Sequence, residues 1–202
     1  MIVKDRKHGA ADPLEWNEAM NLINRLYRDG RYRDSLLVGC GCFFGLRISD
    51  LLTLKWEDIL GKESFVMGEE KTGKERRIKI NSRFASHIRD CWKAEGEPLA
   101  ALPVFGTRVN MGFKPMSRQR AFQLLKEIQE RYGVRSARNF STHSLRKTFG
   151  RKVYDNACGQ GRGEFALLLL KRVFRHSNAS VTERYLGIRN EEIESVYDEL
   201  EF

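Results

Sequence analysis

The chain lacks any long uninterrupted apolar stretch. No segment approaches the ~18 consecutive apolar residues that a membrane-spanning helix needs, and the N-terminal MIVKDRKHGA has no apolar core of a signal peptide. We therefore expect neither a spanning helix nor a signal peptide, and we expect a cytoplasmic protein. The 202 residues also lack internal repeats, low-complexity tracts and a linker that clearly divides them.

Cysteine is scarce and is not arranged to bind metal. The four cysteines show no C-x-x-C spacing and mostly have apolar neighbours; they are Cys40, Cys42, Cys91 and Cys158. This pattern argues against a disulfide framework or a zinc site and predicts buried, reduced thiols. The sequence also shows no clustered carboxylates that would bind a catalytic metal ion.

Positive charge is what the chain has in excess. It carries 36 Lys plus Arg against 27 Asp plus Glu, a formal net charge of +9. Residues 135–176 hold ten basic and two acidic residues, whereas the last fourteen residues hold one arginine and six acidic residues. This distribution predicts a body that binds a polyanion, nucleic acid first and an anionic membrane second, and an acidic tail that avoids it.

The pattern of apolar residues predicts a mostly helical chain. Two short segments of mixed polarity, 64–69 and 75–80, are joined by the turn-like EKTGK and predict a β-hairpin. Residues 96–114 are expected to form a loop. The predicted fold class is thus mainly α with a small antiparallel hairpin. The expected helices cover residues 13–29, 31–44, 48–56, 82–94, 115–132, 143–158, 164–174, 179–185 and 190–201.

Three short motifs contain side chains suited to phosphoryl chemistry. GLRISDLL places Arg47 on a glycine-hinged turn ahead of a helix, where its guanidinium and nearby amides could share one phosphate. THSLR places His143 and Arg146 on the same helical face. His176 is followed nine residues later by Tyr185. A tyrosine hydroxyl, with a pKa of ~10, needs nearby cations and a proton acceptor before it can attack phosphorus.

In this order the motifs resemble the catalytic domain of the tyrosine recombinases, the phage integrase family. The resemblance rests on GLRISDLL with WEDI after it, KTGKER in the predicted hairpin, HSLRKT, and HSN ahead of TERY. It extends from about Asp12 to the C-terminus. It implies an enzyme that cleaves and rejoins double-stranded DNA at specific sites, in recombination or integration of a phage or mobile element, without a cofactor.

The resemblance also implies roles for individual residues. Arg47 and Arg146 would bind the scissile phosphate and neutralise the pentacoordinate transition state. Lys71, near the tip of the predicted hairpin, would protonate the departing 5′ oxygen, and Lys74 is the alternative candidate for this role. Both lysines come from the same KTGK segment.

The remaining roles concern the nucleophile and its surroundings. Tyr185 would form the 3′-phosphotyrosine, His143 would assist proton transfer from it, and His176 would hydrogen-bond the phosphate. Several basic residues are expected to contact DNA: Lys74, Arg76, Lys147, Arg151 and Arg175.

The resemblance predicts a single catalytic domain over residues 1–202. The 46 residues before Arg47 can all be assigned to that domain, so we expect no separate N-terminal core-binding domain. The tail 190–202 carries apolar residues at helical spacing and resembles the helix that family members dock onto a neighbouring protomer. This resemblance implies a homo-tetramer on DNA. The alternative is that the helix packs on its own chain. Two other functions stay open: relaxation of supercoils by a type IB topoisomerase-like enzyme, and a DNA-binding regulator with this fold.

Overall fold

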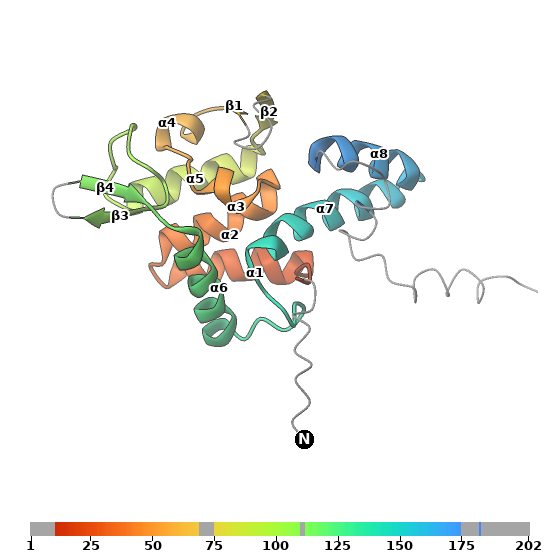
Figure 1. The fold of residues 1–202 in the computed structure, drawn as a ribbon, viewed down its shortest axis with the longest axis horizontal. Helices are drawn as coiled ribbons and strands as arrows, with labels where there is room; N and C mark the ends of the chain where they lie inside the picture. Colours follow the sequence, from red (N-terminus) through yellow and green to blue (C-terminus); the bar gives the residue numbers. More distant parts are fainter. Residues whose placement is uncertain (1–10, 69–74, 110–111, 175–181, 183–202) are drawn as a thin grey trace, which may run out of the picture.

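A computed structural model of the protein describes residues 11–68, 75–109, 112–174 and 182. These residues form helices and two small antiparallel sheets (Figure 1), so the predicted fold class is confirmed. No helix among them is long and apolar enough to cross a membrane. The elements are α1 Trp16–Arg28, α2 Tyr32–Phe44, α3 Ile48–Leu51, α4 Trp56–Ile59, β1 Ser64–Gly68, β2 Glu75–Lys79, α5 Ser82–Ala94, β3 Gly106–Val109, β4 Gly112–Pro115, α6 Arg118–Tyr132, α7 Thr142–Cys158 and α8 Gly163–Phe174.

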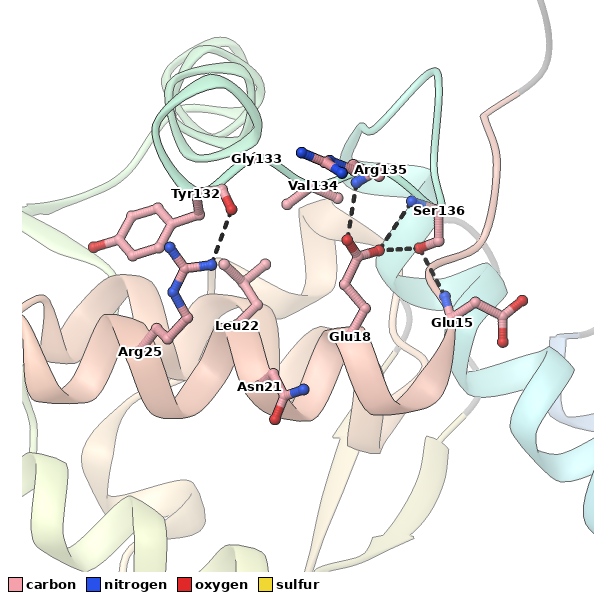
Figure 2. Close-up of a pocket in the computed structure, with 10 residues that line it drawn as sticks. All are labelled: Glu15, Glu18, Asn21, Leu22, Arg25, Tyr132, Gly133, Val134, Arg135 and Ser136. Atoms are coloured by element: carbon pink, nitrogen blue, oxygen red, sulfur yellow. Dashed lines mark hydrogen bonds between the residues drawn. The ribbon is translucent and has the colours of Figure 1, made fainter.

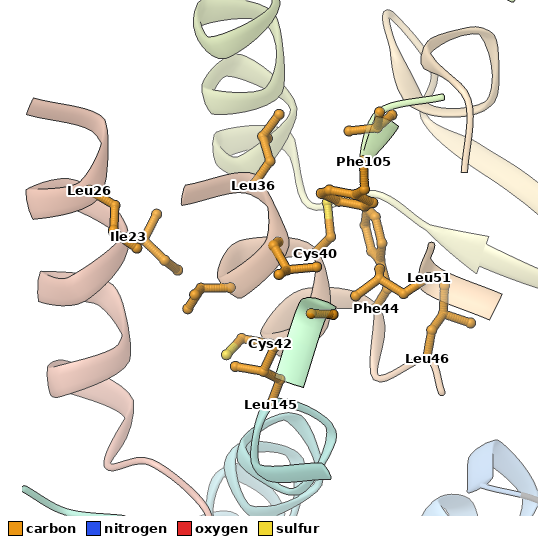
Figure 3. Packing of buried hydrophobic residues seen from close by; sticks show 14 of the residues in the cluster. Ile23, Leu26, Leu36, Cys40, Cys42, Phe44, Leu46, Leu51, Phe105 and Leu145 are labelled. Carbon is orange, nitrogen blue, oxygen red and sulfur yellow. The ribbon is translucent and has the colours of Figure 1, made fainter. Parts of the chain in front are cut away.

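Helix α2 forms the centre of the larger hydrophobic core. Its buried residues lie on every side of the helix, which is the pattern of a helix surrounded by other elements. Ile23 and Leu26 of α1 pack on one side of it, while Phe105 and Leu145 approach from later parts of the chain (Figure 3). The core is therefore closed by contacts between segments that are far apart in the sequence.

Two glycines allow α7 to approach α2 closely. A Cβ atom at Gly41 would lie 2.6 Å from Cβ of Leu145, and one at Gly45 would overlap the ring of Phe149. Gly45 also ends α2 in the left-handed conformation, with φ of 58°. Glycine adopts this conformation without the steric cost that other residues incur. Both glycines are thus required by the crossing of the two helices.

Helices α7 and α8 form a second, smaller hydrophobic cluster. From its start beside α1 and α2, helix α7 extends away from the core, and α8 packs along its C-terminal part (Figure 1). The fully buried residues of this cluster are Leu170 and Phe174 of α8. Phe149 of α7 meets the Phe174 ring edge to face, with centroids 6.1 Å apart. Phe149 therefore links Gly45 on one side to α8 on the other.

Strands β1 and β2 confirm the predicted hairpin, in a register that pairs Phe65 with Ile78. Strands β3 and β4 form a second hairpin that the sequence did not predict. The expectation of a loop over 96–114 was wrong there, and α6 begins at Arg118 rather than at 115. These strands have four residues each and include glycine and proline, so they show no alternation of polarity to detect.

The start of α1 also differs from the prediction. The Asp12 carboxylate accepts a hydrogen bond from the backbone N–H of Asn139 at 3.1 Å instead of capping the helix. The backbone N–H of Leu14 donates to Oγ1 of Thr148 at 2.8 Å. Because these residues are held by tertiary hydrogen bonds, the helix begins only at Trp16.

The helix expected over 48–56 is interrupted. It forms the two short helices α3 and α4, because the backbone N–H of Lys55 donates to the Asp58 carboxylate at 2.8 Å and starts a new helix. The cysteines are free, and Cys40, Cys42 and Cys91 are buried as predicted. Burial raises the pKa of Cys42 to about 12. Cys158, in contrast, is exposed, and the prediction of burial was wrong for it.

Candidate active site

Arg146 is held at the point where α2, α7 and α8 meet. Its side chain is buried, with 4% of its surface exposed. Nη1 donates to the carbonyl oxygen of Gly45 at 3.0 Å, and Nη2 donates to that of Phe174 at 3.1 Å. The guanidinium carbon lies 4.5 Å from the centroid of the Phe174 ring. Carbonyl dipoles and the aromatic face thus compensate for the cost of burying this cation.

Arg47 lies on the turn that these contacts fix in place. It occupies the N-cap position of α3, two residues after Gly45, and its side chain is half-buried. Since Arg146 is hydrogen-bonded to Gly45, helix α7 is tied to the turn that carries Arg47. The structure therefore brings together the two segments that hold the predicted phosphate-binding arginines, and the phosphate-binding role itself stays a prediction.

His143 is the third predicted catalytic residue in the described part of the chain. It lies in the first turn of α7, three residues before Arg146, and its side chain is partly covered and partly open to solvent. Desolvation, and then the positive charges of Arg146 and Lys147, lower the pKa of His143 below its usual range. The imidazole is therefore mostly neutral at pH 7, the form that can accept a proton.

Arg76 was predicted to contact DNA, but the structure gives its guanidinium two backbone partners. Nη1 donates to the carbonyl oxygen of Val173 at 3.0 Å, and Nη2 donates to that of Phe44 at 3.2 Å. The strand pattern indicates only that the side chain of Arg76 faces inward, and it does not indicate these partners. Arg76 alternates with the exposed Arg77 and shares a side of β2 with the buried Ile78, so its side chain faces inward.

The two other described candidates for DNA contact differ from each other. Lys147 is buried, with 7% exposure, and burial lowers its pKa although Asp12 acts in the opposite direction. Its predicted role at DNA stays a prediction. Arg151 is half-buried on α7 and donates from Nε to the Asp155 carboxylate at 2.8 Å. Its predicted role at DNA stays a prediction.

The remaining predicted residues lie outside the described part of the chain, and their roles stay predictions. They are Lys71, Lys74, Arg175, His176 and Tyr185. The expected helices over 179–185 and 190–201 fall there too, except for Thr182, which is described as buried. In the described ranges, no group of three His, Cys, Asp or Glu side chains could hold a metal ion.

A cavity of about 450 Å³ lies elsewhere, between α1 and the loop that joins α6 to α7 (Figure 2). Glu18 accepts hydrogen bonds from the backbone N–H groups of Arg135 and Ser136, at 2.9 and 3.0 Å, and one from the Ser136 hydroxyl. Desolvation alone would raise the pKa of Glu18, but these bonds lower it overall. None of the predicted catalytic residues that the structure describes lines this cavity, so we assign Glu18 to fastening the loop onto α1.

Comparison with known proteins identifies the family. The model of the phage integrase family matches residues 13–192. The probable integrase/recombinase YoeC of Bacillus subtilis is 30% identical over 185 residues, which cover 92% of this chain and 94% of that protein. The chain therefore belongs to the phage integrase family. The tyrosine recombinase XerD of Staphylococcus saprophyticus is 26% identical over 96% of this chain and 63% of its own length.

Solved structures share the fold of this chain. XerA recombinase has a TM-score of 0.69 at 16% identity, over 100% of this chain and 68% of that one. XerH recombinase, in a post-cleavage complex with its difH substrate, has a TM-score of 0.68 at 17% identity. The match covers 98% of this chain and 55% of the XerH chain. The catalytic domain of bacteriophage HP1 integrase has a TM-score of 0.53 at 17% identity. The match covers 94% of this chain and 95% of the HP1 domain.

These comparisons confirm the predicted tyrosine recombinase catalytic-domain fold. The relatives are named integrases and recombinases, which favours that expectation over the topoisomerase and regulator alternatives. The chain spans 63% of the XerD relative and 55% of the XerH chain.

Proposed function

We propose that this chain is a site-specific DNA recombinase that cleaves and rejoins double-stranded DNA through a phosphotyrosine at Tyr185. The observation that carries the proposal is the hydrogen bond from Arg146 to Gly45, which joins one predicted phosphate-binding arginine to the turn that carries the other. Family membership supports the same reaction, and the XerH structure of the same fold contains the DNA substrate of that protein. DNA integration or recombination of a mobile element is the proposed outcome.

In the proposed reaction, the hydroxyl oxygen of Tyr185 attacks phosphorus and the bond to the 5′ oxygen breaks. Arg47 and Arg146 bind the non-bridging oxygens, which gain negative charge in the transition state. Neutral His143 assists removal of the tyrosine proton, and Lys71 gives a proton to the leaving 5′ oxygen. A 5′ hydroxyl then attacks the phosphotyrosine, which restores the tyrosine and joins the new strand.

Four further proposals accompany this reaction. His176 hydrogen-bonds the phosphate during both steps. Residues 1–202 act as one catalytic domain, which is supported by the mutual coverage of 94% and 95% with the HP1 catalytic domain. The tail 190–202 links protomers into a homo-tetramer on DNA, and the protein works in the cytoplasm.

A covalent-trapping assay tests the proposed function. The chain is incubated with nicked duplexes that carry candidate sites, and a protein–DNA adduct that survives denaturation is sought. Tyr185→Phe should abolish the adduct, because phenylalanine has no nucleophilic oxygen. Tyr154→Phe and Tyr197→Phe serve as matched controls and should keep it.

Each result has a distinct meaning. An adduct that persists in Tyr185→Phe but disappears in a control variant would assign the nucleophile to that other tyrosine. DNA binding that weakens steeply with salt, without any adduct on any site, would favour the regulator alternative, because phosphate contacts alone give salt-sensitive binding.

A further inference from the structure

We infer that Arg76 is a positioning residue of the recombinase, which fixes the helix ends that hold Arg146 and the Arg47 turn, and is not a DNA contact. The inference rests on the proposed function. Arg76 and Arg146 both donate hydrogen bonds to backbone carbonyl groups where α2 and α8 approach each other. Helix α2 ends beside them at Phe44, and the described part of α8 reaches them at Phe174.

Helix α2 ends at Phe44, and the carbonyl groups at a helix C-terminus have no partner within the helix and carry a partial negative charge. Arg146 donates to Gly45 and Phe174, while Arg76 donates to the residues just before them, Phe44 and Val173. Each guanidinium thus bridges the end of α2 and the last described turn of α8 through its two terminal nitrogens. Because the accepting carbonyls belong to consecutive residues, the two guanidinium groups lie next to each other.

This paired bridge has consequences for the site. Two adjacent cations repel each other, and the carbonyl groups of both helix ends oppose that repulsion. If Arg76 loses its charge and its two donors, α8 loses the hydrogen bond at Val173 and keeps the one from Arg146 to Phe174. The guanidinium of Arg146 can then move with α8, and its distance to Arg47 is no longer fixed.

Substitution of Arg76 separates the positioning role from a direct DNA contact. Arg76→Met keeps the length of the side chain and removes the donors, and Arg76→Lys is a milder second variant. Arg77→Met is the matched control on the exposed side of the same strand, where Arg77 donates to Oγ of Ser64 at 3.0 Å. Adduct formation is measured on a duplex that the wild-type chain cleaves, together with the salt dependence of DNA binding.

We expect Arg76→Met to slow adduct formation by about a hundredfold, as for loss of one precisely aligned donor, and Arg76→Lys to slow it less. Arg77→Met should leave the rate unchanged. The slope of log binding constant against log salt should stay the same in Arg76→Met, whereas loss of one phosphate contact would reduce its magnitude by about 0.9. Combined with Arg146→Lys, Arg76→Met should add little further loss, because both act through one guanidinium.

Three outcomes would overturn the inference. The first is an unchanged cleavage rate in Arg76→Met, and the second is an equal loss of rate in Arg77→Met. The third is a reduced salt slope in Arg76→Met together with a loss of rate that adds to that of Arg146→Lys. Amide hydrogen exchange gives a reading that does not depend on cleavage. The amides at the end of α8 should exchange faster in Arg76→Met than in Arg77→Met. If the wild-type chain forms no adduct but this exchange difference is found, the proposed function fails while the bridge by Arg76 is real; if the difference is absent, the bridge itself fails.

Discussion

The body built around α2 and the outer pair of α7 and α8 are stabilised in different ways. The body collects apolar side chains from α1, α2, α5, α6 and the start of α7 in one cluster. In α8, in contrast, the fully buried members of its cluster are Leu170 and Phe174, and its end is fastened by the guanidinium bridges of Arg76 and Arg146. Apolar contact tolerates small shifts, but two-point hydrogen bonds do not. Substitutions in the body should therefore act on the whole fold, and those in α8 on the site.

The largest effect should come from the body. Phe44 is buried on α2 and meets the rings of Phe65 and Phe84. Phe44→Ala should lower the free energy of unfolding by about 3–5 kcal/mol, because it removes apolar contacts and leaves a cavity. Urea denaturation followed by circular dichroism measures this loss. A loss below about 1 kcal/mol would show that the body is not the stabilising core.

Phe174→Ala should have a smaller and more local effect. Phe174 is fully buried, but its cluster is small, so we expect α8 to open while the body stays folded. We expect the amides of α8 to exchange at least about tenfold faster, which corresponds to ~1.4 kcal/mol of local opening, while those of α1 and α2 change little. Leu168→Ala, at a side chain that is 56% exposed on α8, is the control. Equal acceleration in α2 would contradict the separation of the two regions.

Acidification should weaken the folded state through histidines in both regions. Desolvation by burial lowers the pKa of His87 in the body, against the opposing effect of Asp90, and desolvation first lowers that of His143 at the start of α7. The unfolded chain then binds more protons than the folded chain, so the free energy of unfolding should fall as the pH drops through about 6.5. Urea denaturation on both sides of that pH should show a smaller decline in His87→Gln and in His143→Gln than in the wild type. A decline of wild-type size in both variants would exclude these histidines as its source.

The smallest effect is expected at the surface of α7. Arg151→Gln breaks the ion pair with Asp155, whose side chain is 47% exposed, and should cost less than about 0.5 kcal/mol. The same variant tests the predicted DNA contact, because loss of one phosphate contact reduces the magnitude of the salt slope by about 0.9. Asp155→Asn is the matched control, since it breaks the same pair and keeps the cation. A salt slope that is unchanged in Arg151→Gln would remove this residue from the DNA-binding surface.

Local patterns in the sequence predicted much of the fold. Helix α5 begins after Asn81, whose side chain accepts the backbone N–H groups of Arg83 and Phe84, as its position before an apolar periodic segment indicated. The start of α1 could not be predicted in the same way. It depends on the pairing of Asp12 with Asn139, which lies 127 residues away.

The candidate site shows the same limit. The motif around Arg47 and that around Arg146 indicated a shared site, and the structure brings the two segments together through Gly45. The partners of Arg76 were not predictable, because they are carbonyl groups 32 and 97 residues away, and any residue type provides a carbonyl. Side-chain motifs can be recognised in a sequence. The backbone carbonyl groups that accept hydrogen bonds from a side chain can be identified only from the three-dimensional positions of the helices.

Gly41 and Gly45, at the crossing of α2 and α7, determine how closely these two helices can pack. The separation of the two helices is fixed by the absence of two methyl groups, one opposite Leu145 and one opposite Phe149. A genetic screen for inactive variants should therefore return substitutions of Gly41 and Gly45 alongside those of the arginines. Neither glycine has a reactive group. By allowing α2 and α7 to pack closely, the two glycines determine how near Arg146 lies to the turn that carries Arg47.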